Sequence, residues 1–158
     1  MRHLLLCVGK LSEPWQRASA GEYMKRLTRY GDFGVVEVAD EREPASLTPA
    51  AIEGLLGREG ERLLRHVRDD DTLIALCLEG ETLTSEQLAR ELRAMIMAGR
   101  RVVWVIGGSL GLSDKVTSRA GRRISLSKMT FPHALARILL LEQLYRASKI
   151  NAGERYHK

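Results

Sequence analysis

The sequence predicts a single α/β domain over residues 1–158, with a mostly parallel sheet that is covered by helices on both faces. Three runs are apolar throughout, as in strands buried on both faces of a parallel sheet: Leu4–Val8, Thr72–Leu78 and Val102–Ile106. Strand-like and helix-like segments also alternate along the chain, which is typical of such sheets. A chain of 158 residues is long enough to bury a sizeable core and supplies one domain.

The first part of the chain supplies two predicted helices with a short strand between them. The first helix begins at Ser12-Glu13-Pro14, because proline is tolerated in a first turn, and it ends near Gly31. Val35–Val38 is the short strand. The charged loop Asp40–Pro44 follows, and we expect it to be the least structured part of the chain. Thr48-Pro49 is an N-cap and first-turn pair that opens the second helix.

An acidic triplet, Asp69-Asp70-Asp71, ends the second helix. Carboxylates are metal ligands, but three consecutive ones converge only in a shaped loop. The favoured interpretation is therefore a solvated turn.

Local signals also bound the next elements. We expect the strand Thr72–Leu78 to end in a turn at Glu79-Gly80-Glu81. Thr84 and Gln87 have the spacing of a capping box and open a helix, which Gly99 ends.

The last helix runs from Pro132 to about Lys149 and is apolar around most of its circumference. Such a helix packs on the sheet and on something else. A second subunit is the natural candidate.

Composition narrows the class of protein. The apolar run Leu4–Val8 is too short for a signal peptide or a membrane span, so we expect a cytoplasmic protein. Cys7 and Cys77 each lie within a predicted strand, which favours buried, reduced thiols over a disulfide. Two thiols are too few for a zinc site, and we expect no metal.

Charge is distributed unevenly along the chain, whose net charge is +5. Residues 1–99 hold 13 Lys/Arg and 17 Asp/Glu, whereas residues 100–158 hold 12 Lys/Arg and three acids. This asymmetry suggests a polyanionic partner for the C-terminal third, with a solvated basic face as the alternative.

The stretch from Val102 to Pro132 contains the candidate site. Its strand leads into Gly107-Gly108-Ser109-Leu110-Gly111, which offers backbone N–H groups and room for close approach. The glycines match neither the dinucleotide fingerprint nor the Walker loop, so this loop alone is equally compatible with a plain turn. A second loop, Ser127–Pro132, ends in a helix start that can direct further N–H groups at a ligand. Ligands of parallel sheets bind beyond the carboxyl ends of strands. Three loops follow such ends, after Leu78, Ile106 and Leu126.

Polar side chains follow the second loop. His133 and Arg137 are four residues apart, hence on one face of the last helix. They are either a solvated pair or part of the site, and their position at its mouth favours the site. The tail, residues 151–158, has no helical pattern and is of a kind normally disordered. It nevertheless contains Tyr156 and His157, which suit base stacking and proton transfer.

As an ordered set, these motifs resemble the RlmH family, small bacterial methyltransferases of the knotted SPOUT superfamily. The resemblance covers essentially the whole chain, and each motif is weak alone. The residues that carry it are Val8-Gly9, Glu59-Gly60-Glu61, Leu76, Glu79-Gly80, Ile106-Gly107-Gly108, Gly111-Leu112-Ser113, Ser125 to His133, Leu144-Tyr145-Arg146-Ala147 and Tyr156-His157.

The resemblance implies an S-adenosyl-L-methionine-dependent enzyme that methylates N3 of a pseudouridine in 23S ribosomal RNA. It implies a homodimer that acts on assembled ribosomes, and a C-terminal trefoil knot, an exception to the rule that chains avoid threading. By resemblance, the cofactor would be held by Leu76, Gly108, Ser127, Lys128, Met129, Thr130, Phe131 and Pro132. The residues that would serve the RNA or the chemistry are His133, Arg137, Tyr156 and His157, with the tail reaching the partner subunit's site.

Methyl transfer to N3 needs in-line positioning and removal of the N3 proton, or binding of the resulting anion. His133, His157 and Tyr156 are candidates for handling the proton, and Arg137 for stabilising negative charge on the base. The sequence does not assign one general base.

Two departures from the family pattern affect the fine geometry. Arg155 stands where proline is usual, and Ser109-Leu110 stands where Pro-Glu is more usual, which removes an acid near the site. Two alternatives stay open: a related knotted methyltransferase that acts on another RNA such as tRNA, and a ribosome-binding module without activity.

Overall fold

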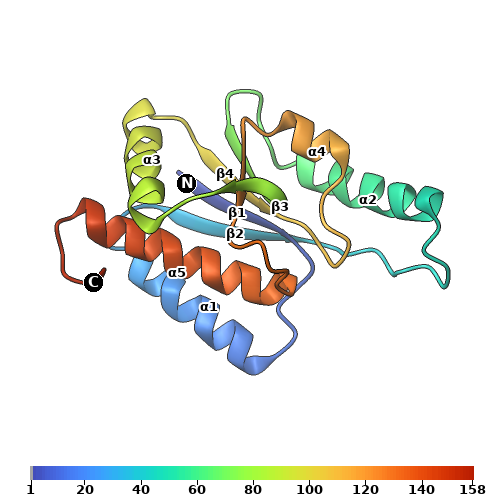
Figure 1. The fold of residues 1–158 in the computed structure, drawn as a ribbon, viewed down its shortest axis with the longest axis horizontal. Coiled ribbons are helices and arrows are strands. Elements are labelled where there is room, and N and C mark those ends of the chain that lie inside the picture. Colours follow the sequence, from blue (N-terminus) through green and yellow to red (C-terminus); the bar gives the residue numbers. More distant parts are fainter. Residues whose placement is uncertain (1) are drawn as a thin grey trace.

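The computed structural model describes residues 2–158 as five strands and five helices around one sheet (Figure 1). The strands are β1 (His3–Val8), β2 (Phe33–Val38), β3 (Thr72–Thr82), β4 (Val102–Ile106) and β5 (Arg122–Ser125). The helices are α1 (Pro14–Leu27), α2 (Pro49–Leu64), α3 (Ser85–Ala98), α4 (Asp114–Arg119) and α5 (His133–Asn151). The strand order is β2-β1-β4-β3-β5, and every pairing is parallel. The predicted α/β class is confirmed.

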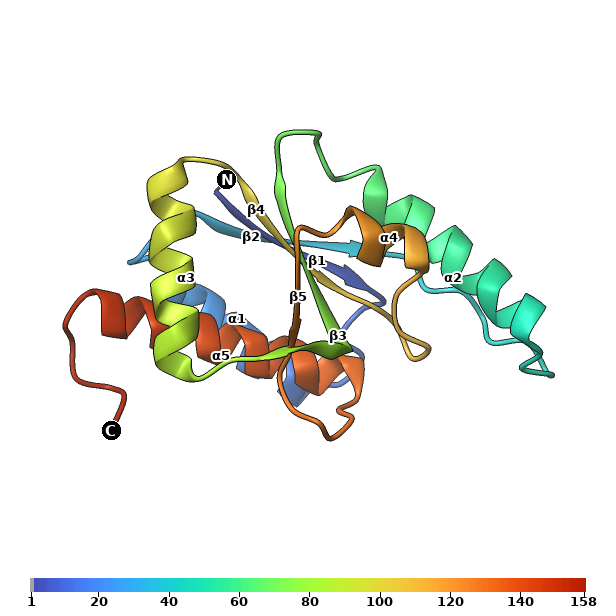
Figure 2. The same ribbon diagram turned by 45° about the horizontal axis from the view of Figure 1, so that its top comes forward.

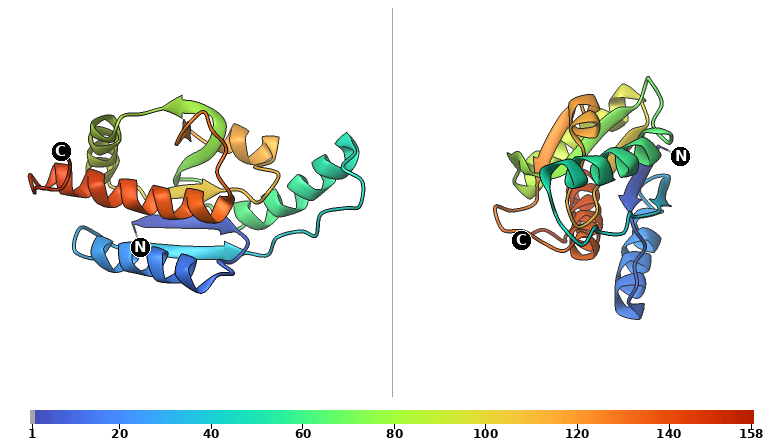
Figure 3. Two further views of the ribbon diagram at one scale, coloured as in Figure 1. Left: turned by 60° about the horizontal axis from the view of Figure 1, so that its bottom comes forward. Right: turned by 90° about the vertical axis from the view of Figure 1, so that its right-hand side faces the viewer.

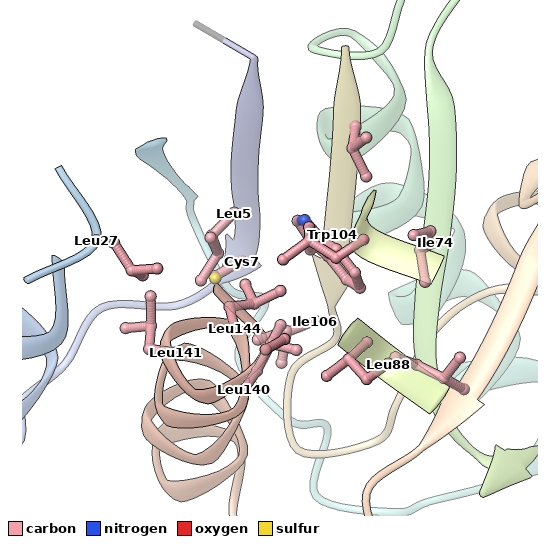
Figure 4. Packing of buried hydrophobic residues seen from close by; sticks show 14 of the residues in the cluster. Leu5, Cys7, Leu27, Ile74, Leu88, Trp104, Ile106, Leu140, Leu141 and Leu144 are labelled. Atoms are coloured by element: carbon pink, nitrogen blue, oxygen red, sulfur yellow. The ribbon is translucent and has the colours of Figure 1, made fainter. Parts of the chain in front are cut away.

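The two faces of the sheet carry separate apolar layers, because side chains of a strand alternate between faces. On β4, Trp104 packs with α1, α3 and α5, whereas Val103 and Val105 pack with α2 and α4. Figure 4 shows Trp104 beside residues of α5, with Leu88 of α3 nearby. Figure 3 shows α1 and α5 running side by side along the sheet. The prediction of helices on both faces is confirmed.

The two cysteines differ in burial, because Cys77 is only partly buried. Cys7 and Cys77 are both free, and Cys7 is buried. Burial raises the pKa of the Cys7 thiol to about 12, so it is uncharged at neutral pH. Among the described residues, no helix is long and apolar enough to cross a membrane.

Helix α3 follows its local signals closely. The Thr84 hydroxyl accepts from the Gln87 backbone N–H, and the Gln87 side chain accepts from the Thr84 N–H, which completes the capping box. Gly99 closes the helix in the left-handed conformation, at φ 70°.

Strand β3 differs from its prediction. The sequence predicted a turn at Glu79–Glu81, but the strand continues through Thr82. Both Leu76 and Glu81 pair with Ile124 of β5, so the four residues between them form a bulge. Gly80 is required there, because a Cβ at this position would lie within 2.6 Å of the Ile124 carbonyl oxygen. Figure 2 shows β3 and β5 crossing at this end of the sheet.

The acidic triplet is not a uniformly solvated turn, because Asp71 is buried and paired with Arg101. The Arg101 Nε donates to the Asp71 carboxylate across 2.8 Å, and the Arg68 N–H donates to it across 2.7 Å. Burial alone would raise the pKa of Asp71, but the Arg101 and Arg68 contacts lower it overall. No group of three or more His, Cys, Asp or Glu residues within 2–158 has a geometry that could hold a metal ion.

Candidate functional site

A cleft of about 940 Å³ lies beyond the carboxyl ends of β4 and β5, and beside the second half of β3 at Leu76–Glu79. This position is where parallel sheets bind ligands. Its volume is within the usual range for small-molecule and cofactor sites. Three segments supply most of its wall: Leu76–Glu79, Ile106–Leu112 and residues 125–133 except Lys128. Asp114, Thr117, Arg123 and Ala136 complete it.

The glycine loop forms one side of the cleft and is closely packed on itself. A Cβ on Gly107 would overlap the carbonyl of Gly111, so only glycine fits. The Gly111 N–H donates to the Gly108 carbonyl across 3.2 Å, and Gly111 has φ 91°. The loop therefore has a fixed shape, and its three glycines leave backbone without a side chain at the cleft wall.

The second loop is ordered by two serines. The Ser125 hydroxyl donates to the Ser127 carbonyl across 2.7 Å, and the Ser127 hydroxyl accepts from the Met129 N–H across 3.0 Å. Pro132 is the N-cap of α5 and supplies no side-chain acceptor, so N–H groups of the first turn are left available. Such a helix start attracts anionic groups.

The lining fits a cofactor with an apolar and a polar part. Leu76, Ile106 and Leu126 offer an apolar wall, while the backbone of the two loops and the start of α5 offers hydrogen-bond partners. Of the residues expected to hold the cofactor, all line the cleft except Lys128. Lys128 is exposed within the second loop, between lining residues Ser127 and Met129.

His133 and Arg137 share a face of α5, as their spacing predicted, but only His133 lines the cleft. Arg137 is 2% exposed and lies behind it. Its guanidinium donates to the Gly9 carbonyl across 2.8 Å and pairs with Glu37 of β2. Arg137 thus ties α5 to the carboxyl ends of β1 and β2, and its Nε has no hydrogen-bond partner among the described residues.

The tail is ordered, contrary to what its composition suggests. Tyr156 packs edge-on against Tyr145, with ring centroids 5.0 Å apart, and its hydroxyl donates to Glu142 across 3.2 Å. The guanidinium of Arg146 lies over its ring. Burial, with the nearby Glu142 charge, raises the pKa of Tyr156 to about 12. The hydroxyl is therefore protonated at neutral pH.

The tail does not reach the cleft of this chain. The His157 Nε2 lies 2.7 Å from a carboxylate oxygen of Glu86, at the start of α3. Glu142, which holds Tyr156, is nine residues along α5 from His133, or roughly 13 Å at the helical rise. Neither Tyr156 nor His157 lines the cleft.

Three features near the cleft were not predicted to act there. Glu59 of α2 is buried against Gly108, and the loop after β2 is held to the glycine loop by Ser109, whose hydroxyl donates to Glu43 across 2.5 Å. Arg123 lines the cleft. Glu59 was part of the family resemblance, and that was its only signal. The charged loop gave none, because its order depends on partners far along the chain.

Comparisons with a family model and with known proteins all identify methyltransferases. The family model described as "Predicted SPOUT methyltransferase" matches residues 1–157. A protein of Bifidobacterium adolescentis named "Ribosomal RNA large subunit methyltransferase H" is 49% identical, with 100% of both chains covered. A Clostridium novyi protein of the same name is 45% identical, again with 100% of both chains covered.

Solved structures share the fold at low identity. A probable methyltransferase from Bordetella pertussis Tohama I has a TM-score of 0.59 and 19% identity, with 93% of this chain and 94% of that chain covered. A probable methylase family protein from Haemophilus influenzae Rd KW20 has a TM-score of 0.55 and 15% identity. That match covers 99% of this chain and 70% of the other.

Proposed function

This chain belongs to the SPOUT methyltransferase family, and we propose that it is an S-adenosylmethionine-dependent enzyme that methylates N3 of a pseudouridine in 23S ribosomal RNA. The main support for this proposal is full-length sequence identity of 45% and 49% with two proteins named as large-subunit ribosomal RNA methyltransferases. The cleft supports the same activity, because its walls are the loops that the family resemblance assigned to the cofactor. Residues 1–158 act as one SPOUT-type domain, and its trefoil knot stays a prediction.

The cofactor's proposed holders are Leu76, Gly108 and the loop 127–132. Leu76 supplies apolar surface, Gly108 supplies backbone, and the uncapped start of α5 offers N–H groups to a carboxylate. When bound, S-adenosylmethionine supplies an electrophilic methyl group on a sulfonium. The task of the chain is then to hold the acceptor nitrogen in line and to deal with its proton.

His133 is the proposed group for the N3 proton. Of the three candidates for proton handling, it alone lines the cleft of its own subunit. A neutral imidazole nitrogen can take the proton as the bond from N3 to the methyl carbon forms. Arg137 acts by position, because it is buried and bound to Gly9 and Glu37.

A homodimer would complete the site. Leu135 and Leu139, one turn apart on α5, are exposed at 36% and 37%, although α5 already packs on the sheet, α1 and α3. This unpartnered strip supports contact with a second copy, as the sequence predicted. In the proposed dimer, Tyr156 and His157 of each subunit serve the cleft of the other.

RNA requires a basic surface, and the C-terminal third has fewer unpaired cations than its charge count implies. Five cations of the C-terminal third are paired with carboxylates: Arg101, Arg122, Arg137, Arg146 and Lys149. Lys115 and Lys128 have no such partner among the described residues, and Arg123 lines the cleft. We assign these three to RNA phosphates. The proposed substrate, the assembled ribosome, places the enzyme in the cytoplasm.

Mass mapping of RNA from a strain that lacks the gene tests the proposal. We expect one pseudouridine of 23S rRNA to lose a methyl group, and to regain it when the gene is restored. Unchanged 23S rRNA with a methyl group missing from tRNA would favour the alternative substrate. No change in any RNA would favour a binding module without activity.

A further inference from the structure

Glu59 is a buried carboxylate that the proposed chemistry does not use. It lies on α2 and is 4% exposed. Its Oε1 accepts from the Glu41 N–H across 2.8 Å, whereas its Oε2 is buried and has no partner among the described residues. Burial raises the pKa of Glu59, and the charges of Asp40 and Glu41 add to the rise. Burial of a carboxylate oxygen without a hydrogen-bond partner costs free energy of folding, which suggests that Glu59 has a role at this position.

The carboxylate of Glu59 backs the glycine loop on the side away from the cleft. A Cβ on Gly108 would lie 3.3 Å from its Oε2 and 3.1 Å from the side chain of Val8. Gly108 itself lines the cleft. The next residue of α2, Gly60, lies directly under Ser113, where a Cβ would overlap the serine hydroxyl. Residues 59 and 60 therefore pack against the glycine loop at Gly108 and against Ser113 just after it.

The same carboxylate also fixes the loop that follows β2. Glu41, whose N–H it binds, has its own carboxylate paired with Arg58 and Arg62 of α2. Two residues later, Glu43 accepts from the Ser109 hydroxyl of the glycine loop. One buried side chain thus connects the loops at the ends of β2 and β4, and a second contact joins them near the cleft.

We propose that Glu59 is a positioning residue of the cofactor cleft, which holds Gly108 and the 40–43 loop in the arrangement that binds S-adenosylmethionine. This inference rests on the proposed function of the cleft. Glu59 would not touch the bound cofactor, because it does not line the cleft and lies behind Gly108. Its effect is on the shape of the site, which must be held closely for binding.

Titration calorimetry of the full chain with S-adenosylmethionine separates positioning from simple stability. The fitted stoichiometry reports the fraction of folded protein, whereas Kd reports the geometry of the site. Glu59→Ala removes the hydrogen bond to the Glu41 N–H and the packing against Gly108. Glu59→Asp withdraws the carboxylate by one methylene. Glu59→Gln keeps the size of the side chain and an oxygen that accepts from the Glu41 N–H. Glu61→Ala is the matched control, because Glu61 is on the same helix and exposed.

We expect Glu59→Ala to raise Kd by about tenfold at unchanged stoichiometry, and Glu59→Asp to raise it by roughly threefold to fivefold. Glu59→Gln should restore Kd to within about threefold of wild type, and Glu61→Ala should leave it unchanged. If Glu59→Ala does not fold, Glu59→Asp decides. A fall in stoichiometry at unchanged Kd would overturn the proposal, as would wild-type Kd in the Ala and Asp variants. Absence of binding to the wild-type chain would instead refute the function on which the inference rests.

Discussion

Arg137 donates a hydrogen bond across 2.8 Å to the carbonyl of Gly9, and so joins helix α5 to the carboxyl end of strand β1. His133, one turn earlier on α5, approaches the same glycine: its Nε2 lies 3.7 Å from where a Cβ on Gly9 would be. Gly9 has φ 78°, a conformation that suits glycine. The residue that lines the cleft and the residue that anchors the helix therefore converge on one backbone position.

Removal of the Arg137 side chain should destabilise the folded chain strongly. Arg137→Ala removes a buried cation from Glu37 and from the Gly9 carbonyl, and we expect the free energy of unfolding to fall by about 3 kcal/mol. Arg26→Ala, which breaks an exposed pair with Glu22, should lower the free energy of unfolding much less, because solvent screens that pair. Urea denaturation measures both. If both variants lose the same free energy of unfolding, the buried Arg137 contributes no more to stability than an exposed ion pair does.

The crossing of β3 and β5 depends on Gly80. Gly80→Ala places a Cβ against the Ile124 backbone, which cannot move aside as a flexible side chain can. We expect the loss of stability to exceed about 2 kcal/mol. Gly57→Ala is the control, because nothing lies within 4 Å of its Cβ position on α2, and it should stabilise the chain by about 0.5 kcal/mol. If Gly80→Ala has the same melting temperature as the wild type, this bulge is not packed as described.

Stability should depend on pH through His3. Burial, assisted by the charge of Arg2, lowers the pKa of His3 from 6.5 to about 4. Between these values the unfolded chain binds more protons than the folded one, so the free energy of unfolding rises with pH. The contribution is fully present above pH 6.5 and is lost as pH falls through about 4, a change of about 3 kcal/mol.

Replacement of His3 tests this assignment. His3→Phe, which keeps a ring beside Phe33, should flatten the dependence of stability on pH in that window. His66→Phe should keep it, because His66 is exposed. Urea midpoints at several pH values between 4 and 7 give the comparison, and an undiminished slope in His3→Phe would assign the effect elsewhere.

The proposed exchange of tails between subunits predicts complementation. His133→Ala and Tyr156→Ala should each be inactive as homodimers. In a heterodimer, one cleft would combine an intact His133 with an intact tail from the other subunit. A refolded equal mixture should then regain about a quarter of wild-type activity, since half the dimers are mixed and each has one good site. Activity that stays at the level of the separate variants would place the tail in its own subunit's site.

Where the determinants are local, the sequence predicts the fold well. The boundaries of α3 follow from Thr84, Gln87 and Gly99, which act within a few residues of one another. The course of β3 does not, because its continuation past Leu78 depends on pairing with Ile124, more than forty residues away. The order of the 40–44 loop likewise depends on distant partners, Arg58, Arg62 and Ser109.

In the candidate site, too, local features could be predicted from the sequence and features that depend on distant contacts could not. Spacing placed His133 and Arg137 on one face of a helix, and they do share it. Spacing carries no information on the rotation of that helix about its axis, which the packing of Leu140, Leu141 and Leu144 on the sheet determines. For this reason the burial of Arg137 could not be predicted. The contacts of Tyr156 with Glu142 and Tyr145 were equally hidden, because a polar tail has no periodicity to interpret.

Transfer of a radiolabelled methyl group from S-adenosylmethionine to purified ribosomes tests the central claim most directly. The ribosomes should come from the strain that lacks the gene, with tRNA from that strain as the competing acceptor. The account predicts label in 23S rRNA at N3 of one pseudouridine, no label in tRNA, and loss of label with His133→Ala. No transfer to ribosomes by folded protein that binds the cofactor, or transfer to tRNA alone, would contradict it.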